Sequence, residues 1–240
     1  MIGTERQQAI LDYMRKNETI SVREIVKTFY VSEATARRDL NELENSGLVR
    51  RVFGGATLLI GSDRQVPLFV REREDEREKK HIGERASTLI KDGQILFIDG
   101  SSTAQFLLPY LGRFKDLIVI TNGLKIAQEL GDMHIKVYST GGLLMENSSV
   151  LIGEDAERFV DGFNADICFL SCKGLSDDGK LTDTSYSETQ LRKRFLANSN
   201  TKVFLITKNK IGKKYIHTLC TTKDVDYIVM DEETPLESLH

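Results

Sequence analysis

Polar and apolar residues alternate at helical spacing through the N-terminal part of the chain. Three segments, residues 6–17, 21–29 and 32–43, each place apolar side chains on one face and polar ones on the other. Ser21 and Ser32 stand where N-caps of the second and third segments are needed. The pattern therefore predicts three packed helices. Their apolar positions are Ile10, Leu11 and Met14, then Val22, Ile25, Val26 and Phe29, then Ala36, Leu40 and Leu43.

The third segment has the composition of a helix that enters a DNA groove. Small residues and arginines fill its first turns, where a helix end meets base edges and phosphates. Thr35, Arg38 and Asn41 point away from the apolar face, and Arg37 lies on its flank. Asp39 lies nearer the packed side, so we expect it to orient an arginine or a backbone amide. The segment is interpreted as a recognition helix.

A short strand after this helix predicts a wing. Gly47 is a natural helix stop, residues 48–52 alternate in polarity, and Gly54-Gly55 allows a turn. We therefore assign residues 1–57 to a winged helix-turn-helix domain that is all-α apart from its wing. Arg50 and Arg51 would approach the DNA backbone from this wing.

The pattern changes beyond residue 58. Residues 58–74 are assigned to a linker, a charged helix is expected over residues 71–90, and residues 75–240 form a second domain. In that domain, short apolar runs bounded by polar turns alternate with helical stretches, which is typical of α/β folds with a mostly parallel sheet covered on both faces. The runs are residues 95–98, 117–120, 135–138, 167–170, 203–206 and 227–230.

Small and polar residues follow four of these predicted strands. Because the carboxyl ends of parallel strands share one edge, four such loops predict a ligand pocket there. Hydroxyls, free amides and a nearby lysine suit a small anion such as a phosphate or carboxylate. The loops contain Asp99, Gly100, Ser101, Ser102 and Thr103; Thr121, Asn122 and Gly123; Ser139, Thr140, Gly141 and Gly142; and Ser171, Cys172, Lys173 and Gly174.

Charge and composition limit how DNA would be held. The chain has a net charge of −3, and residues 1–57 carry nine Lys and Arg against eight Asp and Glu, a charge of about +1. DNA affinity must then come from a local patch of Arg37, Arg38, Arg50 and Arg51, with two or more such heads acting together.

Composition also argues against several other classes. The three cysteines show no CxxC spacing and the four histidines are scattered, so we expect neither a metal site nor a cofactor. We see no signal peptide or membrane span, and we expect a cytoplasmic protein that does not contact membranes.

A helix-turn-helix signature covers residues 6–40, through the type and spacing of Arg6, Ile10, Met14, Ser32, Thr35, Ala36, Arg37, Arg38, Asp39 and Leu40. In these residues the chain resembles the DeoR family of bacterial transcription regulators. The second half is similar to the sensor domain of the same family, through Asp99-Gly-Ser-Ser-Thr, Thr121-Asn122, Gly141-Gly142 and residues 182–188. That domain is similar in fold to ribose-5-phosphate isomerase, and its members typically respond to a phosphorylated sugar or a related metabolite. The resemblance implies that Ser101, Ser102, Thr103, Asn122, Gly142, Lys173 and Glu188 line an effector site.

Three positions depart from the family pattern. Met145 stands where many relatives have an arginine, Arg192 replaces a lysine, and Thr207 replaces an aspartate in the segment before Lys210. Arg192 is still assigned to the effector site with the loop residues Asp99, Thr121, Gly141 and Gly174.

Alternatives remain at this point. An isomerase would use Glu188 as its base, but a guanidinium at position 192 cannot exchange a proton at working pH. Residues 174–180 have P-loop spacing, yet Leu181 replaces the magnesium-binding hydroxyl. A DNA-binding regulator whose second domain only assembles subunits is the third alternative.

The sequence favours a transcriptional repressor rather than an enzyme. Its partners would be a double-stranded DNA operator, a phosphorylated sugar and further copies of the chain, in a dimer or tetramer. Ser32 and Thr35 would fix phosphates, and Arg38 and Asn41 would reach base edges.

Overall fold

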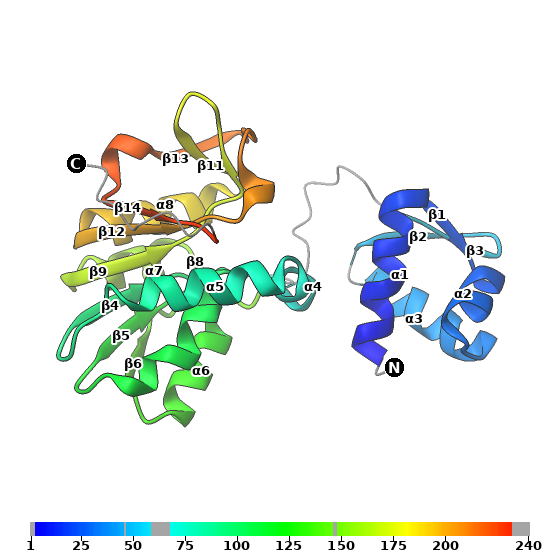
Figure 1. Cartoon of the computed structure of the whole chain (residues 1–240), viewed down its shortest axis with the longest axis horizontal. Helices are drawn as coiled ribbons and strands as arrows, with labels where there is room; N and C mark the ends of the chain where they lie inside the picture. Colours follow the sequence, from blue (N-terminus) through cyan, green and yellow to red (C-terminus); the bar gives the residue numbers. More distant parts are fainter. Residues whose placement is uncertain (1–2, 46, 59–67, 146–147, 232–240) are drawn as a thin grey trace. The chain divides into compact units, whose positions relative to one another are not determined.

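The computed structural model describes residues 3–45, 47–58, 68–145 and 148–231 (Figure 1). Its internal contacts divide the chain into two compact units, Met1–Arg73 and Glu74–His240. Among the described residues, none of the helices is both long enough and apolar enough to cross a bilayer.

The first unit contains the three expected helices and the wing. The helices are α1 Gly3–Asn17, α2 Val22–Phe29, α3 Glu33–Asn45 and α4 Leu68–Arg73, and the strands are β1 Thr19–Ser21, β2 Val49–Val52 and β3 Gly55–Leu58. β2 and β3 form the wing hairpin, and β3 also pairs antiparallel with β1, giving the strand order β1-β3-β2. Gly55 permits this arrangement, because a Cβ there would lie 2.2 Å from the carbonyl oxygen of Ile20. The winged helix-turn-helix prediction is confirmed.

Local sequence signals explain how α2 begins and ends. The Ser21 hydroxyl accepts from the backbone N–H of Glu24 (3.1 Å), and the Glu24 carboxylate accepts from the backbone N–H of Ser21 (2.7 Å), which completes a capping box. Tyr30 ends the helix in the left-handed conformation, at φ 53°. The chain can then turn directly into α3.

A buried ion pair joins α1 to α3. The Arg6 guanidinium donates through Nε to Asp39 Oδ2 (2.5 Å) and through a terminal nitrogen to Asp39 Oδ1 (3.0 Å), and both residues are buried. Hydrogen bonding to Asp39 raises the pKa of Arg6, although burial opposes this. Of the two partners that the sequence analysis allowed for Asp39, an arginine or a backbone amide, the structure shows an arginine.

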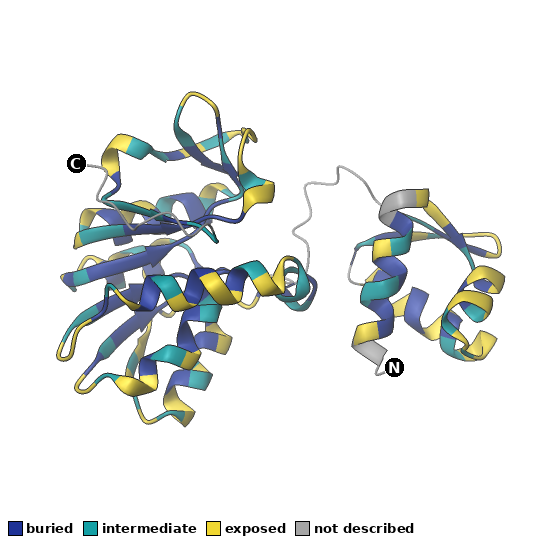
Figure 2. Ribbon diagram, in the orientation of Figure 1, coloured by how far each residue is buried: buried dark blue, intermediate teal, exposed yellow. Residues whose placement is uncertain are grey.

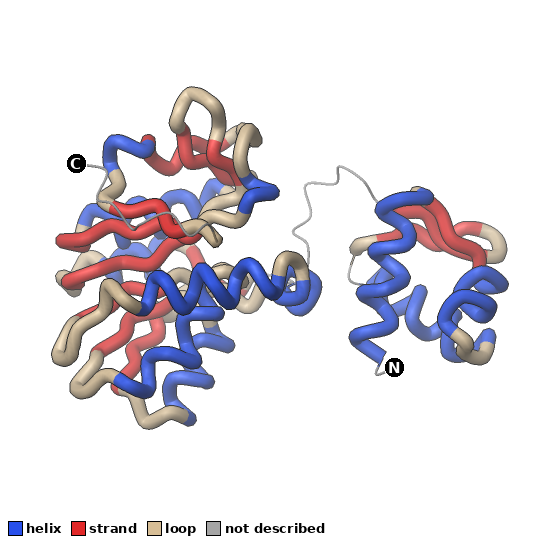
Figure 3. Tube along the Cα trace, viewed as in Figure 1, coloured by secondary structure: helices blue, strands red, loops and turns tan. Residues whose placement is uncertain are grey.

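The second unit is built on a six-stranded parallel sheet in the order β14-β12-β9-β4-β5-β6 (Figure 3). All six predicted strands are present, with ends shifted by a few residues at most. They are β4 Ile95–Ile98, β5 Ile118–Thr121, β6 Lys136–Ser139, β9 Ala165–Leu170, β12 Ser199–Leu205 and β14 Tyr227–Val229.

Helices cover both faces of this sheet. One apolar layer joins it to α5, η1 and α6, and another joins it to α7 and α8. Since both faces are buried, the strands are continuously apolar. The helices are α5 Glu76–Ser87, the 3₁₀ segment η1 Ala104–Arg113, α6 Leu124–Asp132, α7 Glu154–Val160 and α8 Tyr186–Ala197, with short 3₁₀ turns η2 Lys208–Lys210 and η3 Thr222–Asp224.

Two small antiparallel sheets complete the unit. One has the order β10-β11-β13, and the other pairs β7 with β8. Their strands are β7 Leu143–Leu144, β8 Leu151–Ile152, β10 Gly174–Leu175, β11 Lys180–Asp183 and β13 His217–Thr221.

The segment around the predicted linker differs from expectation. The single helix predicted over residues 71–90 is wrong, because Asp75 adopts a left-handed conformation (φ 53°) and separates α4 from α5. The predicted linker, 58–74, has regular structure at its described ends, in β3 and α4. Its residues 59–67 lie outside the described part of the chain.

Asp39→Ala should lower the free energy of unfolding of the first unit by about 3–5 kcal/mol, because it leaves the buried Arg6 guanidinium without its carboxylate. Hydrogen exchange of the α1 and α3 amides, followed by mass spectrometry, measures the loss. Glu33→Gln is the control, since it breaks only the exposed pair with Arg37 and should cost less than about 1 kcal/mol. Equal protection in the two variants would contradict the prediction.

Candidate DNA-binding surface and effector site

Ser32 directly precedes α3 and caps its N-terminus. Its hydroxyl accepts a hydrogen bond from the backbone N–H of Thr35 (3.2 Å). The hydroxyls of these two residues also lie 2.9 Å apart, so both are held at the start of the helix. The buried face of α3 carries Ala36, Asp39, Leu40 and Leu43, as the alternation of buried and exposed ribbon in Figure 2 illustrates. The opposite face is therefore available to a partner.

That opposite face carries the predicted DNA-binding side chains. Arg37, Arg38 and Asn41 are exposed. Arg37 pairs with Glu33 (3.3 Å) and Arg38 with Glu42 (3.9 Å), each one turn away and each on the surface. Exposed pairs at this spacing contribute only about 0.3–0.5 kcal/mol, so a phosphate or base edge can displace these carboxylates.

The two wing arginines have different surroundings. Arg50 is exposed, as expected for a residue that approaches the DNA backbone. Arg51 is half-buried, and its guanidinium donates to the Gly55 carbonyl oxygen (3.0 Å) and to Asn41 Oδ1 (2.5 Å). Sequence reasoning treated the two arginines alike, whereas the structure directs Arg51 back toward α3.

Two exposed aromatic residues in the first unit escaped the sequence analysis. Tyr30 is 92% exposed at the turn before α3, and Phe53 is fully exposed at the tip of the wing. Single exposed aromatic side chains are common on protein surfaces, so these two residues do not by themselves indicate a partner. The signal available in the sequence was their place in the two turns of a helix-turn-helix and its wing.

In the second unit, the polar loops meet where the strand order reverses. The chain runs outward from the central strand β4 through β5 to β6, then returns to β9 on the other side of β4 and continues to β12 and β14. In open α/β sheets, ligands bind at this switch point, outside the carboxyl ends of the strands. Asp99 follows β4 and Ser171 follows β9, so the two predicted loops flank it.

The Asp99 carboxylate joins these two loops. Its Oδ1 accepts from the backbone N–H of Ser101 (3.1 Å), and its Oδ2 accepts from the backbone N–H of Ser171 (3.1 Å) and from Arg192 Nε (2.8 Å). Asp99 is 1% exposed. The structure therefore gives this residue partners within the protein.

Arg192 occupies the centre of a buried cluster of carboxylates. Besides Asp99, its terminal nitrogens contact Asp183 (3.0 Å) and Glu188 (3.1 Å), one from β11 and one from its own helix α8. Burial disfavours the guanidinium, but Glu188, Asp99 and Asp183 outweigh it, and the pKa of Arg192 is raised. Sequence reasoning assigns Arg192 to the effector site, and in the structure its guanidinium contacts three carboxylates of the chain.

Three lysines reach the same switch point. Lys79 of α5 is buried and donates to the Ser102 hydroxyl (3.3 Å), and Lys210 donates to the hydroxyls of Ser171 (2.7 Å) and Thr103 (3.3 Å). Lys173 donates to Thr184 (2.6 Å). Burial lowers the pKa of Lys210, against the opposing effect of nearby carboxylates. Ammonium groups beside hydroxyls can bind a phosphate or carboxylate.

Sequence reasoning assigned Lys173 to this site and missed Lys79. Lys79 sits in a charged helical stretch that resembles a solvated helix, so its pattern gave no warning that the side chain turns inward. Sequence reasoning named Lys210 only to locate the segment that contains Thr207 and did not assign it to the site. Thr207 is buried, and its hydroxyl donates to Asn209 (2.8 Å).

Other predicted site residues have supporting roles in the structure. Asn122 accepts from the backbone N–H of Gly100 (2.8 Å) and donates to the carbonyl oxygen of Leu151 (3.0 Å), and the Thr121 hydroxyl accepts from the backbone N–H of Gly123 (3.0 Å). Both residues are buried and fix the loop after β5.

Gly141 and Gly142 follow β6 at the edge of the sheet, two strands from β4. Gly142 is left-handed, with φ 103°, and a Cβ there would lie 2.5 Å from the Ile152 carbonyl oxygen. Gly174, in β10, is equally confined, since its Cβ would lie 2.4 Å from the Lys213 carbonyl oxygen.

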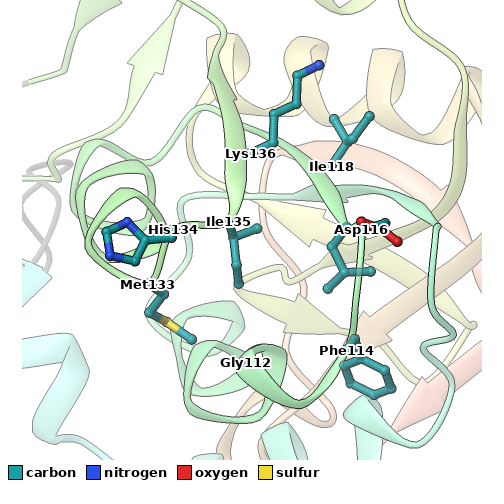
Figure 4. Close-up of a pocket in the computed structure, with 9 residues that line it drawn as sticks. Gly112, Phe114, Asp116, Ile118, Met133, His134, Ile135 and Lys136 are labelled. Atoms are coloured by element: carbon teal, nitrogen blue, oxygen red, sulfur yellow. The ribbon is translucent and has the colours of Figure 1, made fainter.

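A separate depression of about 440 Å³ lies at the opposite edge of the sheet, where β5 and β6 begin (Figure 4). Phe114, Leu117, Met133 and Ile135 line it together with His134, among others. It contains none of the residues assigned to the effector site. Among the residues that the structure describes, no three His, Cys, Asp or Glu side chains are grouped as a metal site would require.

Comparison with known proteins identifies both units. The model of the DeoR-like helix-turn-helix domain matches residues 6–60, and that of the DeoR C terminal sensor domain matches residues 74–232. The chain belongs to the DeoR family. Similar family members include the HTH-type transcriptional regulator GolR of Listeria innocua, 35% identical over 97% of this chain and 92% of that protein. The Lactose phosphotransferase system repressor of Staphylococcus aureus is 32% identical (95% and 92%), and the Glycerol-3-phosphate regulon repressor of Escherichia coli is 29% identical (98% and 94%).

Like the relatives named above, this DeoR-family chain is a DNA-binding transcriptional regulator and not an enzyme. Solved structures share its fold alone. They include eIF2B delta from Chaetomium thermophilum, with a TM-score of 0.50 and 15% identity over 85% of this chain and 65% of that one. A ribose 5-phosphate isomerase from Methanocaldococcus jannaschii has a TM-score of 0.43 and 19% identity over 57% and 55%. The strand order of the wing and the six-stranded parallel sheet between helices confirm the predicted fold class of this regulator.

Arg192→Met should lower the Tm of this regulator by roughly 10 °C, because removing one partner of a buried ion cluster costs about 3–5 kcal/mol. Thermal unfolding followed by circular dichroism measures the shift. Arg194→Met, on the same helix, is the matched control, since its pairs with Glu157 and Asp161 are long and half-exposed. A shift no larger than that of the control would mean that the lysines, not Arg192, compensate the carboxylates.

Proposed function

We propose that this regulator is a repressor that binds an operator through its first unit and releases it when a phosphorylated sugar or related metabolite binds its second unit. Two of the relatives are named as repressors, one of a glycerol-3-phosphate regulon and one of a lactose phosphotransferase system. Both names concern phosphorylated compounds or their uptake, which supports an effector of this chemical class.

The observation that carries the effector proposal is the placement of Lys79 and Lys210. Both ammonium groups contact hydroxyls of the loops at the strand switch point, on Ser102, Thr103 and Ser171. A phosphate would take the place of these hydroxyls as the lysines' partner, or bind beside them, with charge-assisted hydrogen bonds. The carboxylates around Arg192 limit the net positive charge of the site, so that phosphate binding remains reversible.

For DNA, we propose that α3 lies in the major groove. Ser32 and Thr35 contact phosphates at the start of the helix, Arg38 and Asn41 reach base edges, and Arg50 approaches the backbone from the wing. Since residues 1–57 carry a charge of only about +1, one head binds weakly, and the regulator acts as a dimer or tetramer. The effector then favours an arrangement in which two heads no longer reach both half-sites.

Retardation of the promoter region next to this chain's own coding sequence, with and without a panel of sugar phosphates, tests the proposal. We expect specific binding that one compound releases. Specific binding that no compound affects would contradict the effector proposal and favour a regulator without a small-molecule ligand. The absence of specific binding would contradict the operator proposal.

Lys79→Met and Lys210→Met should bind the same DNA as the unchanged chain but require at least about tenfold more of the releasing compound, because each removes a charge-assisted bond worth about 1.5–3 kcal/mol. Titration of the compound in the retardation assay measures this. Lys213→Met, an exposed lysine in the segment after η2, is the control and should respond normally. An unchanged response in both variants would place the effector elsewhere.

Arg38→Ala should weaken operator binding by about 1–3 kcal/mol and relax specificity at one base pair. Competition with operators substituted at each position measures both effects. Equal weakening on every sequence would instead identify Arg38 as a phosphate contact. Arg50→Ala provides the comparison, since a backbone contact predicts uniform weakening and a smaller salt dependence.

A further inference from the structure

The Arg51 side chain contacts both the wing turn and the recognition helix. Arg51, in β2, donates from Nε to the Gly55 carbonyl oxygen (3.0 Å) and from Nη1 to Asn41 Oδ1 (2.5 Å) and the Arg37 carbonyl oxygen (3.5 Å). Its backbone N–H donates to Glu44 (2.8 Å). The guanidinium is therefore fixed from both sides, by the wing turn and by α3.

This contact determines which way the Asn41 amide faces. A guanidinium has five N–H donors and no acceptor, so the atom of Asn41 that it contacts must be the carbonyl oxygen. The Nδ2 group, with its two N–H donors, then lies on the other side of the amide. Asn41 is exposed, so these donors are available on the outer face of α3.

An asparagine held in this way differs from a free one. A free asparagine recognises adenine by accepting from N6–H through Oδ1 and donating to N7 through Nδ2. Arg51 takes one of the two lone pairs of Oδ1 and holds this oxygen toward the wing, so an approaching N6–H meets mainly the Nδ2 donors, beside a positive charge. Guanine offers only acceptors in the major groove, N7 and O6, and suits a surface made of donors.

We propose that Arg51 is a positioning residue that holds the Asn41 amide with its Nδ2 donors outward and so directs it to guanine instead of adenine. The inference rests on the proposed placement of α3 in the major groove. Arg51 need not touch the base itself, because it acts by fixing the orientation of the Asn41 amide.

The test is selection of binding sites from a pool of randomised DNA duplexes with the full-length chain, followed by sequencing of the bound fraction. Asn41→Ala identifies the position that Asn41 contacts, as the one where discrimination is lost. At that position we expect the unchanged chain to prefer guanine over adenine by about tenfold, within the range of a good base contact. We expect Arg51→Ala to shift the preference toward adenine.

Two further variants separate positioning from wing stability. Asn41→Asp keeps an oxygen for Arg51 but removes the Nδ2 donors, so the guanine preference should disappear while the Arg51 contact is retained. Arg51→Lys, which can still donate to Asn41, should keep part of the guanine preference that Arg51→Ala loses. Arg50→Ala, on the same strand, should weaken binding to all sequences without changing any base preference.

An adenine preference in the unchanged chain would overturn the inference. A guanine preference that survives both Arg51→Ala and Asn41→Asp would overturn it as well. Enriched sites that Asn41→Ala leaves unaffected also overturn it, because Asn41 then does not read a base. Failure of the unchanged chain to enrich any sequence would instead count against the proposed operator function.

Discussion

The Asp99 carboxylate holds together the part of the second unit where a ligand would bind. It accepts backbone N–H groups from the loops after two adjacent parallel strands, whose connections leave the sheet in opposite directions. Such N–H groups need a partner when they are buried. A buried carboxylate in turn needs a cation, which Arg192 supplies, and the remaining N–H groups of Arg192 bring in Asp183 and Glu188. The group of three carboxylates is thus a consequence of the reversal of strand order between β4 and β9.

This arrangement divides the polar residues of the site between two roles. Asp99, Arg192 and Asn122 hold loops and helices in place, while Lys79 and Lys210 contact hydroxyls that a ligand can replace. The same sequence motif, Asp99-Gly-Ser-Ser-Thr, contributes to both, because Asp99 binds backbone and Ser102 and Thr103 face lysines. Residue type alone does not separate the two roles, since each group is polar and buried.

The sequence predicted the strands well because buried parallel strands are uninterrupted apolar runs, as in residues 95–98 and 203–206. It placed Asp39 on the packed side of its helix and left its partner open between an arginine and a backbone amide, and the structure shows Arg6. It did not predict the break at Asp75, where a residue other than glycine is left-handed, or the inward direction of Lys79 and Arg51. These depend on partners far away in the chain or across a turn, which periodicity does not report.

Lys79 lies close to the point where the chain enters the second unit, and this position affects how the entering helix is anchored. The first unit ends at Arg73, and α5, which carries Lys79, begins at Glu76. The helix by which the chain enters the second unit is therefore tethered at its first turns to the Ser102 hydroxyl. Under the proposed function, a phosphate that competes for this tether would change how tightly α5 is anchored, and so the number of conformations open to the covalent junction between the units. The junction would then respond to a ligand through chain entropy, with no need for a rigid lever between the units.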